Sequence, residues 1–399
     1  MKKILIWDYR IPLRNSGGPS GYLYQIKQQL LSEPTDQIHF LSEYVQETET
    51  ALSTKHSKLS EISKSNEILA TARHIFSCYR ITHNPFPINL LDTVNINEFT
   101  HIHFHLTIDY YNARHLLRNY NGIIVVTSHS PEPLSQEITN KMFKSNNIIV
   151  KLCKRSIKAA ENWAFRNADK IMFPAEEAME PYLKDTSFRR IFLNKKSDIV
   201  FCPTAILPKT FDENYINNLR GEYNIPDDAF LISYIGRHNK IKGYDIIKNI
   251  ATEIYKKGLN IYFIIAGIQG PLYKLENDKW IEIGWTDKAS EIIKASDLFI
   301  LPNRETYFDL VALEVLRSGC PILMSLTGGN KYFNNNFSNY KGIRFFKVDD
   351  LQHAIEEILI FKKIKEESEN WFSLRESNIE LWKNHFTLPV YINRYIDIL

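Results

Sequence analysis

The sequence predicts an α/β fold with two doubly wound domains. Its 399 residues are too many for one ordinary hydrophobic core, so two domains are expected. Short apolar runs alternate with stretches of helical periodicity, which is typical of sheets covered by helices. The alternation stops at a polar segment near residues 204–210 and then starts again, so we place the linker between the domains there.

Six strands are expected in each half of the chain, and five of the six in the first half can be located. In the first half, the apolar runs that indicate strands are 4–7, 102–105, 123–129, 170–173 and 199–202. In the second half, they are 231–235, 261–266, 281–284, 298–301, 322–325 and 343–347. The segments 22–31, 161–169 and 308–318 have the pattern of helices between these strands.

The composition is that of a soluble globular protein, with 44% apolar and 24% charged residues. A net charge of +3 gives no argument for nucleic acid, and we expect no such partner. Four cysteines without metal-ligand spacing indicate reduced thiols. The apolar run after Lys2-Lys3 is too short for a signal peptide, and no apolar run approaches 18 residues. These features predict a cytoplasmic protein.

The most informative stretch runs from Asp297 to Gly319. An apolar strand is followed by the polar residues 303–306, and a helical pattern starts at Phe308. Asp309 is expected to cap this helix, and Gly319 is expected to end it. A loop between a strand and a helix N-terminus is a natural anion site. Glu314, further along the helix, is placed to accept hydrogen bonds from ligand hydroxyl groups.

A second loop with suitable chemistry follows the strand 231–235. Gly236 permits a turn, Arg237 offers a planar fork of donors, and Lys242 offers a point charge. Both cations suit a diphosphate. The alternative is that two surface cations share this loop by chance.

The first half has a glycine-rich loop with Gly17 and Gly18 after its first strand, where backbone amides can approach a ligand. The alternative is a tight turn between strand and helix. His129 ends another apolar strand, where sites of α/β proteins are built. His101, His103 and His105 alternate along one strand and therefore share a face. A metal site is conceivable for these three, but packing and hydrogen bonding are favoured.

Residues 45–75 carry scattered lysines and an arginine among polar residues. They suit either a basic helix that faces a membrane surface or a plain solvated helix, and the second is favoured.

Several of these motifs together resemble the retaining GT-B glycosyltransferases, especially glycosyltransferase family 4 (glycosyl transferases group 1). The matching residues are Gly236-Arg237, Lys242-Gly243, Glu314 and Gly319-Cys320-Pro321. The family carries a first glutamate eight residues before the one at Glu314. Here that position is Thr306, with Glu305 one residue before it, and Asp309 stands where the family has glycine.

The resemblance implies a GT-B fold, in which two Rossmann-like domains face each other across a cleft. It places an acceptor-side domain at 1–205, a nucleotide-sugar domain at 206–375, and a C-terminal helix at 376–399 that packs on the first domain. It implies catalytic roles for His129, Arg237, Lys242, Glu305 and Glu314. It implies ligand contacts for Gly17, Gly18, Gly236, Gly267, Trp285, Thr306, Phe308, Asp309 and Leu310. For Trp285, a core position is an equally good interpretation.

The resemblance also implies the activity. It is the transfer of a sugar, with retention, from a nucleotide-diphosphate sugar to a glycan or lipid-linked acceptor in surface polysaccharide or glycolipid synthesis. We expect no cofactor and no metal, and we expect peripheral contact with the inner face of the membrane. Three alternatives remain: a nucleotide-sugar epimerase, a catalytically silent GT-B scaffold, and a dinucleotide oxidoreductase. The oxidoreductase is disfavoured because a full GxGxxG is absent.

Overall fold

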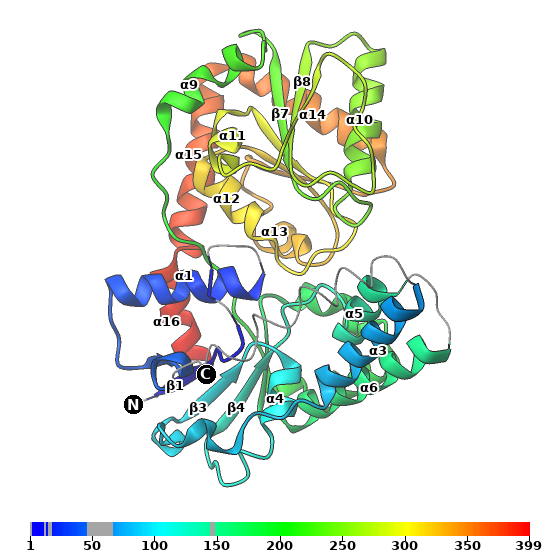
Figure 1. Ribbon diagram of the computed structural model, residues 1–399. Helices are drawn as coiled ribbons and strands as arrows, with labels where there is room; N and C mark the ends of the chain where they lie inside the picture. Colours follow the sequence, from blue (N-terminus) through cyan, green and yellow to red (C-terminus); the bar gives the residue numbers. More distant parts are fainter. Residues whose placement is uncertain (1, 12, 15–17, 46–66, 144–147) are drawn as a thin grey trace. The chain divides into compact units, whose positions relative to one another are not determined.

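A computed structural model describes the chain except for residues 1, 12, 15–17, 46–66 and 144–147. The chain forms two compact units (Figure 1). Unit 1 comprises Met1–Phe173, Met179–Cys202 and Arg394–Leu399. Unit 2 comprises Pro174–Ala178 and Pro203–Asn393. The segment that we assigned to a C-terminal helix, 376–399, is therefore divided between the two units.

Unit 1 is built on a parallel sheet of six strands in the order β2-β1-β3-β4-β5-β6. The strands are β1 (Ile4–Trp7), β2 (Ile38–Phe40), β3 (His101–Phe104), β4 (Ile123–Thr127), β5 (Lys170–Phe173) and β6 (Ile199–Phe201). Five of them were expected from the sequence. The short β2 was not located, because three residues give too little periodicity to stand out.

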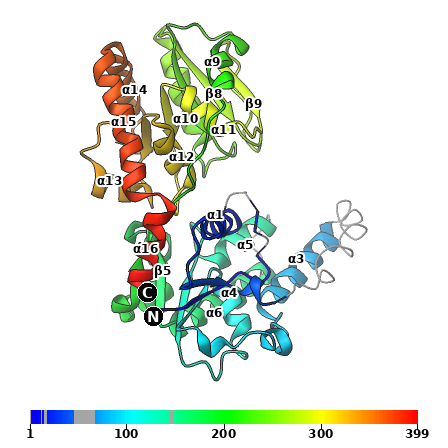
Figure 2. The ribbon, with the colours of Figure 1, turned by 90° about the vertical axis from the view of Figure 1, so that its left-hand side faces the viewer.

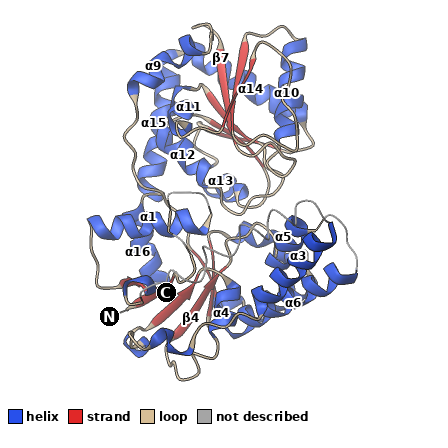
Figure 3. Ribbon diagram, viewed as in Figure 1, coloured by secondary structure: helices blue, strands red, loops and turns tan. Residues whose placement is uncertain are grey.

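The main helices of unit 1 flank both faces of its sheet (Figure 3). They are α1 (Pro19–Ser32), α3 (Glu67–Thr82), α4 (Thr107–Ala113), α5 (Leu134–Met142), α6 (Ile148–Asn167), α7 (Glu180–Leu183) and α8 (Thr186–Asn194). Helices α3 and α5 lie against the long α6 (Figure 2). The predicted helix 161–169 is thus the end of a longer one. Most of the predicted basic helix, 45–75, lies outside the described residues.

Unit 2 has a second parallel sheet of six strands, in the order β12-β11-β10-β7-β8-β9. The strands are β7 (Phe230–Ile235), β8 (Ile261–Ala266), β9 (Trp280–Gly284), β10 (Leu298–Leu301), β11 (Ile322–Ser325) and β12 (Ile343–Phe346). All six were expected within one or two residues at each end. The connections between these parallel strands are mostly helical, as parallel pairing requires.

The helices of unit 2 are α9 (Glu213–Glu222), α10 (Tyr244–Lys256), α11 (Ala289–Ala295), α12 (Leu310–Ser318), α13 (Asn330–Phe337), α14 (Leu351–Glu366) and α15 (Ser368–His385). The last helix, α16 (Leu388–Ile398), begins in unit 2 and ends in unit 1. Helix α12 ends at Gly319, whose φ of 72° is left-handed, so the predicted glycine stop is confirmed. No helix in the described part of the chain is long and apolar enough to cross a bilayer.

In each sheet, the strand order reverses at one point. In unit 1 the neighbouring strands there are β1 and β3, and in unit 2 they are β7 and β10. In doubly wound sheets, ligands bind outside the carboxyl ends of the strands at this switch point. The loops after β7 and after β10 lie together at the switch point of unit 2. These are the two loops of the second half that the sequence predicted as anion sites.

Candidate active site

The loop after β7 is held by one buried tyrosine. Tyr234 is 1% exposed, and its hydroxyl lies 3.0 Å from the carbonyl oxygen of Arg237 and 3.2 Å from that of Lys242. The single hydroxyl therefore ties together the two ends of the segment that carries both cations. Sequence reasoning missed this role, because an apolar strand with one tyrosine suggests only core packing.

The loop after β10 is tied to the loop after β7 by Arg304. Its guanidinium binds both carboxylate oxygens of Asp245, at 2.6 and 2.8 Å, and donates to the carbonyl of Lys240 at 2.7 Å. The backbone of Gly243 passes so close to Pro302 that a Cβ there would lie 1.9 Å from its carbonyl oxygen. The two loops therefore form one connected surface at the switch point.

Lys242 does not present a free charge on this surface. Its Nζ lies 2.9 and 3.0 Å from the two carboxylate oxygens of Asp309. The amide of Asn303 also donates to Asp309, and the carbonyl of Asn303 is held by Ser325 at 2.6 Å and by Thr327 at 2.8 Å. Arg237 is exposed. A diphosphate that reached this surface would compete with Asp309 for Lys242.

The predicted cap of α12 by Asp309 is wrong. Asp309 occupies the N-cap position with an extended backbone, but its side chain makes no capping hydrogen bond, because Lys242 and Asn303 hold the carboxylate. The first amides of α12, beginning at Leu310, therefore lack a side-chain acceptor from the cap. A helix N-terminus in this state favours an anion.

The residues between the β10 strand and α12 differ strongly in exposure. Glu305 is exposed, whereas Thr306 is 1% exposed and its hydroxyl has no hydrogen-bond partner. Phe308 is 6% exposed and packs against Phe333 and Phe386. The side chain of Phe308 thus belongs to the core, and only its backbone remains as a ligand contact.

Glu314 lies in α12, partly buried, and burial raises the pKa of its carboxyl group. The positive charges of Arg317 and Lys209 oppose that rise in pKa. Arg317 is anchored by a 2.6 Å hydrogen bond to the carbonyl of Leu207. The Glu314 carboxylate therefore lies in a positive field on the side of α12 that faces the start of unit 2.

Two predicted contacts for a nucleotide base follow β8 and β9. Gly267 has a φ of 144°, and a Cβ there would lie 1.9 Å from the carbonyl oxygen of Gly236. Trp285 is 74% exposed, so the interpretation of this residue as core is wrong. An indole exposed at the carboxyl end of a strand remains suited to stacking on a base.

In unit 1, Gly17 lies outside the described residues. Gly18 is exposed at the N-cap of α1, with a φ of 79° and open space where a Cβ would stand. His129 follows β4 and is partly buried, and desolvation lowers its pKa to about 4, so it is neutral at physiological pH. Its Nε2 lies 2.9 Å from Nδ1 of His105.

His101 and His103 lie on the same face of β3 as His105. His101 bonds to the carbonyl of Leu399 at 2.8 Å, and His103 bonds to the hydroxyls of Tyr395 and Thr127 at 2.6 and 2.8 Å. The preferred interpretation, packing and hydrogen bonding, is confirmed for these side chains. In the described ranges, no group of three or more His, Cys, Asp or Glu side chains is arranged to hold a metal.

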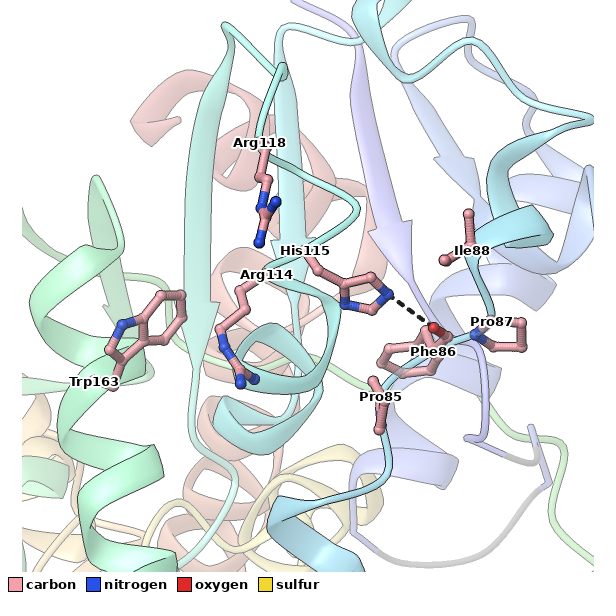
Figure 4. A pocket seen from close by; sticks show the side chains of 8 residues that line it. All are labelled: Pro85, Phe86, Pro87, Ile88, Arg114, His115, Arg118 and Trp163. Carbon is pink, nitrogen blue, oxygen red and sulfur yellow. Dashed lines mark hydrogen bonds between the residues drawn. The ribbon is translucent and has the colours of Figure 1, made fainter.

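A separate cavity of about 710 Å³ opens in unit 1 (Figure 4). It is lined by Pro85, Phe86, Pro87, Ile88, Arg114, His115, Arg118 and Trp163. His115 is held by the carbonyl of Phe86 at 2.9 Å. The two arginines lie between α4 and β4, and Trp163 comes from α6. The cavity includes none of the predicted site residues.

The chemistry at the switch point agrees with a comparison against protein families. Residues 229–360 match the family described as Glycosyl transferases group 1. The resemblance of the sequence to glycosyl transferases group 1 is confirmed. The matched range contains both loops of the switch point and Glu314.

Two relatives from bacterial surface polysaccharide synthesis are similar to this chain. The O-antigen biosynthesis glycosyltransferase WclY of Escherichia coli is 30% identical over 116 residues, which cover 27% of this chain and 32% of WclY. The lipopolysaccharide 1,2-N-acetylglucosaminetransferase of Salmonella typhimurium is 25% identical over 293 residues, which cover 65% of this chain and 76% of that protein. The alignment with WclY thus spans about a third of its length.

Among solved structures, sucrose-phosphate synthase from Thermosynechococcus elongatus has a similar fold. The TM-score is 0.63 at 15% identity, covering 100% of this chain and 98% of that one. Anabaena HepE, solved with UDP-glucose, gives a TM-score of 0.58 at 13% identity, covering 100% and 99%. Both likenesses concern the fold, and together with the two six-stranded parallel sheets they confirm the predicted GT-B fold.

Proposed function

We propose that this chain is a retaining glycosyltransferase that moves a sugar from a nucleotide-diphosphate sugar to a glycan or lipid-linked acceptor in surface polysaccharide or glycolipid synthesis. The observation that carries the proposal is the switch point of unit 2. There Arg237, Lys242 and the uncapped start of α12 converge within the range that matches the glycosyltransferase family. The named relatives in O-antigen and lipopolysaccharide synthesis support the acceptor class.

The chemistry that this surface supplies is stabilisation of a leaving group. As the sugar leaves, negative charge grows on the nucleoside diphosphate. Arg237 donates a charge-assisted fork to that charge, and the amides at Leu310 add the positive end of a helix. Lys242 contributes once the diphosphate displaces Asp309. Glu314 accepts hydrogen bonds from ribose hydroxyls, and Trp285 stacks on the base.

The transferred sugar would lie beside the loop that carries Glu305 and Thr306. Because the Thr306 hydroxyl is buried, the exposed Glu305 is the better candidate to replace the first glutamate of the family. His129 of unit 1 would contact a sugar hydroxyl or the acceptor. We propose that no metal is required, because two cations and a helix N-terminus already meet the diphosphate.

The test is a donor screen followed by a transfer assay. UDP-glucose, UDP-N-acetylglucosamine, GDP-mannose and ADP-glucose are each added to the full chain, and the melting temperature is followed. A donor at about 100 times its Kd should add about 2.7 kcal/mol to the free energy of unfolding. The donor that binds is then incubated with lipid-linked saccharide acceptors, with and without EDTA.

The NMR coupling at the anomeric carbon of the product should show retention, and EDTA should leave the rate unchanged. Consumption of donor without acceptor, with inversion at a ring carbon, would indicate an epimerase instead. Failure of all four donors and of the bare diphosphates to bind would contradict the proposed function.

We further propose that unit 1 makes peripheral contact with an anionic membrane surface through α3 and α6. Large apolar side chains are exposed on both helices, with Phe76 60%, Tyr79 56%, Ile148 75% and Leu152 61% exposed. The two helices lie side by side, with Thr82 3.2 Å from Ser156. The same two helices also carry exposed arginines and a lysine, at Arg73, Arg80, Lys151 and Arg155.

No acidic residue occurs in 68–83 or in 148–160. Exposed apolar side chains together with positive charges on the same two helices suit anionic lipid. The cavity of Figure 4 has the same combination of apolar and positively charged side chains, because its lining includes two arginines and no acidic residue.

The expected result is binding of the full chain to vesicles that contain phosphatidylglycerol and weak binding to pure phosphatidylcholine. Replacing Phe76 and Leu152 together by serine should weaken co-sedimentation by at least about tenfold, because two inserted apolar groups are lost. The matched control replaces Leu31 and Leu193, which are 69% and 67% exposed on other helices of unit 1, by serine. Equal losses in both double variants would contradict a specific surface on α3 and α6.

A further inference from the structure

His129 contacts a second histidine, His105, that the predicted mechanism does not use. His105 is 1% exposed and follows β3, and its ring lies 5.2 Å from that of His129 with 20° between the planes. The Nδ1 of His105 and the Nε2 of His129 are 2.9 Å apart, which is a hydrogen-bond distance. One of these two nitrogens must carry the proton that they share.

Both rings are neutral, because burial lowers the pKa of His105 well below its usual value and lowers that of His129 to about 4. A neutral imidazole carries its proton on one nitrogen and has a lone pair on the other. The position of the shared proton therefore decides the tautomer of both rings.

The far nitrogen of His105 decides between the two arrangements. The Nε2 atom of His105 is buried and has no hydrogen-bond partner. If His129 donated, His105 would carry its proton on this Nε2, as a buried N–H without an acceptor. If His105 donates from Nδ1, the buried Nε2 holds only a lone pair. Orphaned buried N–H groups are rarer in proteins than under-satisfied acceptors.

We infer that His105 is a positioning residue, which donates from its Nδ1 to His129 and so holds His129 in the tautomer with its proton on Nδ1. His129 then carries its N–H on Nδ1, and its Nε2 is occupied by His105. It can donate to an oxygen, such as a sugar hydroxyl or a phosphate oxygen, but it cannot take up a proton through Nε2. That this ligand is a donor sugar or its acceptor rests on the proposed function.

The surroundings of His105 restrict its movement. The ring of His103 lies 4.0 Å away, and His103 is itself fixed by the hydroxyls of Tyr395 and Thr127. Tyr22 of α1 packs against both members of the pair, with ring centroids 5.7 Å from His105 and 5.0 Å from His129. The direction of the N–H that reaches His129 is therefore set by the packing of β3, α1 and the end of α16.

The test uses long-range nitrogen–proton correlation spectra of the full chain labelled at the histidine rings. The spectra should show His105 and His129 both protonated at Nδ1. In His105→Asn, the amide replaces the Nδ1–H group as donor, so His129 should keep its tautomer. In His105→Leu, the donor is lost, and His129 should show a mixture of tautomers. His101→Asn, on the same strand face but remote from His129, is the matched control.

Turnover supplies a second readout. With the donor found in the screen, His105→Leu should lower kcat/KM about tenfold, whereas His105→Asn should stay within about threefold of the natural protein. A wild-type spectrum with the proton on Nε2 of His129 would overturn the inference. So would an unchanged His129 tautomer in His105→Leu.

If no nucleotide sugar is transferred at all, the proposed function fails while the spectra still decide the tautomer. If His105→Leu does not fold, the wild-type and His105→Asn spectra decide it.

Discussion

Replacing Gly267 by alanine should destabilise unit 2 by about 2–6 kcal/mol, the sum of backbone strain and a steric clash. The φ of 144° disfavours any side chain, and the new Cβ would lie 1.9 Å from the carbonyl oxygen of Gly236. Neither backbone can move without opening the ends of β7, β8 and β9, because Gly236 donates to Ala266 at 3.0 Å and Gly267 donates to Gly284 at 2.8 Å.

The chain offers two matched controls for this glycine. Gly258 also has a positive φ, 68°, but nothing stands within 4 Å of its would-be Cβ, so Gly258→Ala should cost only about 1–2 kcal/mol. Gly221 lies in α9 with open space around it, so Gly221→Ala should stabilise by up to about 1 kcal/mol.

Because the protein has two units, amide hydrogen exchange in increasing urea should be read separately from peptides of each unit. A Gly267→Ala variant no less stable than Gly258→Ala would show that the approach of the two backbones is not tight.

Replacing Arg237 by alanine should weaken binding of UDP, or of whichever diphosphate the screen selects, by about ten- to a hundredfold, because a charge-assisted pair is lost. Asp309→Asn should have the opposite sign and strengthen binding by about two- to fivefold. The reason is the ion pair at 2.9 Å: without the carboxylate, Lys242 is released to the diphosphate and a repelling charge is removed. Lys242→Ala should cost less than Arg237→Ala, because Asp309 already holds the charge of Lys242.

Calorimetry with the bare diphosphate measures all three variants, and Asp245→Asn, in the first turn of α10, serves as a control for loss of an acid near the same loops. Asp245 binds Arg304 rather than Lys242, so its replacement should not strengthen binding. Weaker binding in Asp309→Asn would mean that the Asp309 carboxylate favours diphosphate binding. Repeating the titration with magnesium and with EDTA would then show whether a cation bridges the carboxylate and the diphosphate.

Much of the fold followed from local patterns. Ile261–Ala266 and Leu298–Leu301 are apolar runs bounded by polar residues, glycine or proline, and both became buried parallel strands. Gly319 became the left-handed end of α12, because a helix followed by a strand needs a residue that tolerates positive φ there. Such features depend on a few neighbouring residues, so the sequence alone suffices. The three-residue β2 was missed because its strand character comes from pairing with β1.

The positions of Arg237, Lys242 and Glu314 were also predictable, because their spacing from glycines and strand ends is a local property. Their partners were not. Because Asp309 stands directly before a helix, the sequence predicted that it caps the helix. Its carboxylate instead binds Lys242, which is 67 residues away in sequence. Trp285 could have been core or surface, since an indole suits both: Trp280 at the start of β9 is 6% exposed, whereas Trp285 just after the strand is 74% exposed.

The sequence by itself determined the two parallel sheets, the switch-point loops and the residue types on them, because strand length, helix period and glycine turns are set by adjacent residues. Only the tertiary structure decided which charges meet and which groups are buried. The bond between His105 and His129 joins residues 24 apart, and the clamp of Tyr234 on both ends of its loop depends on how β7 turns. Hydrogen bonds and burial depend on distances across the fold, and no local pattern records those distances.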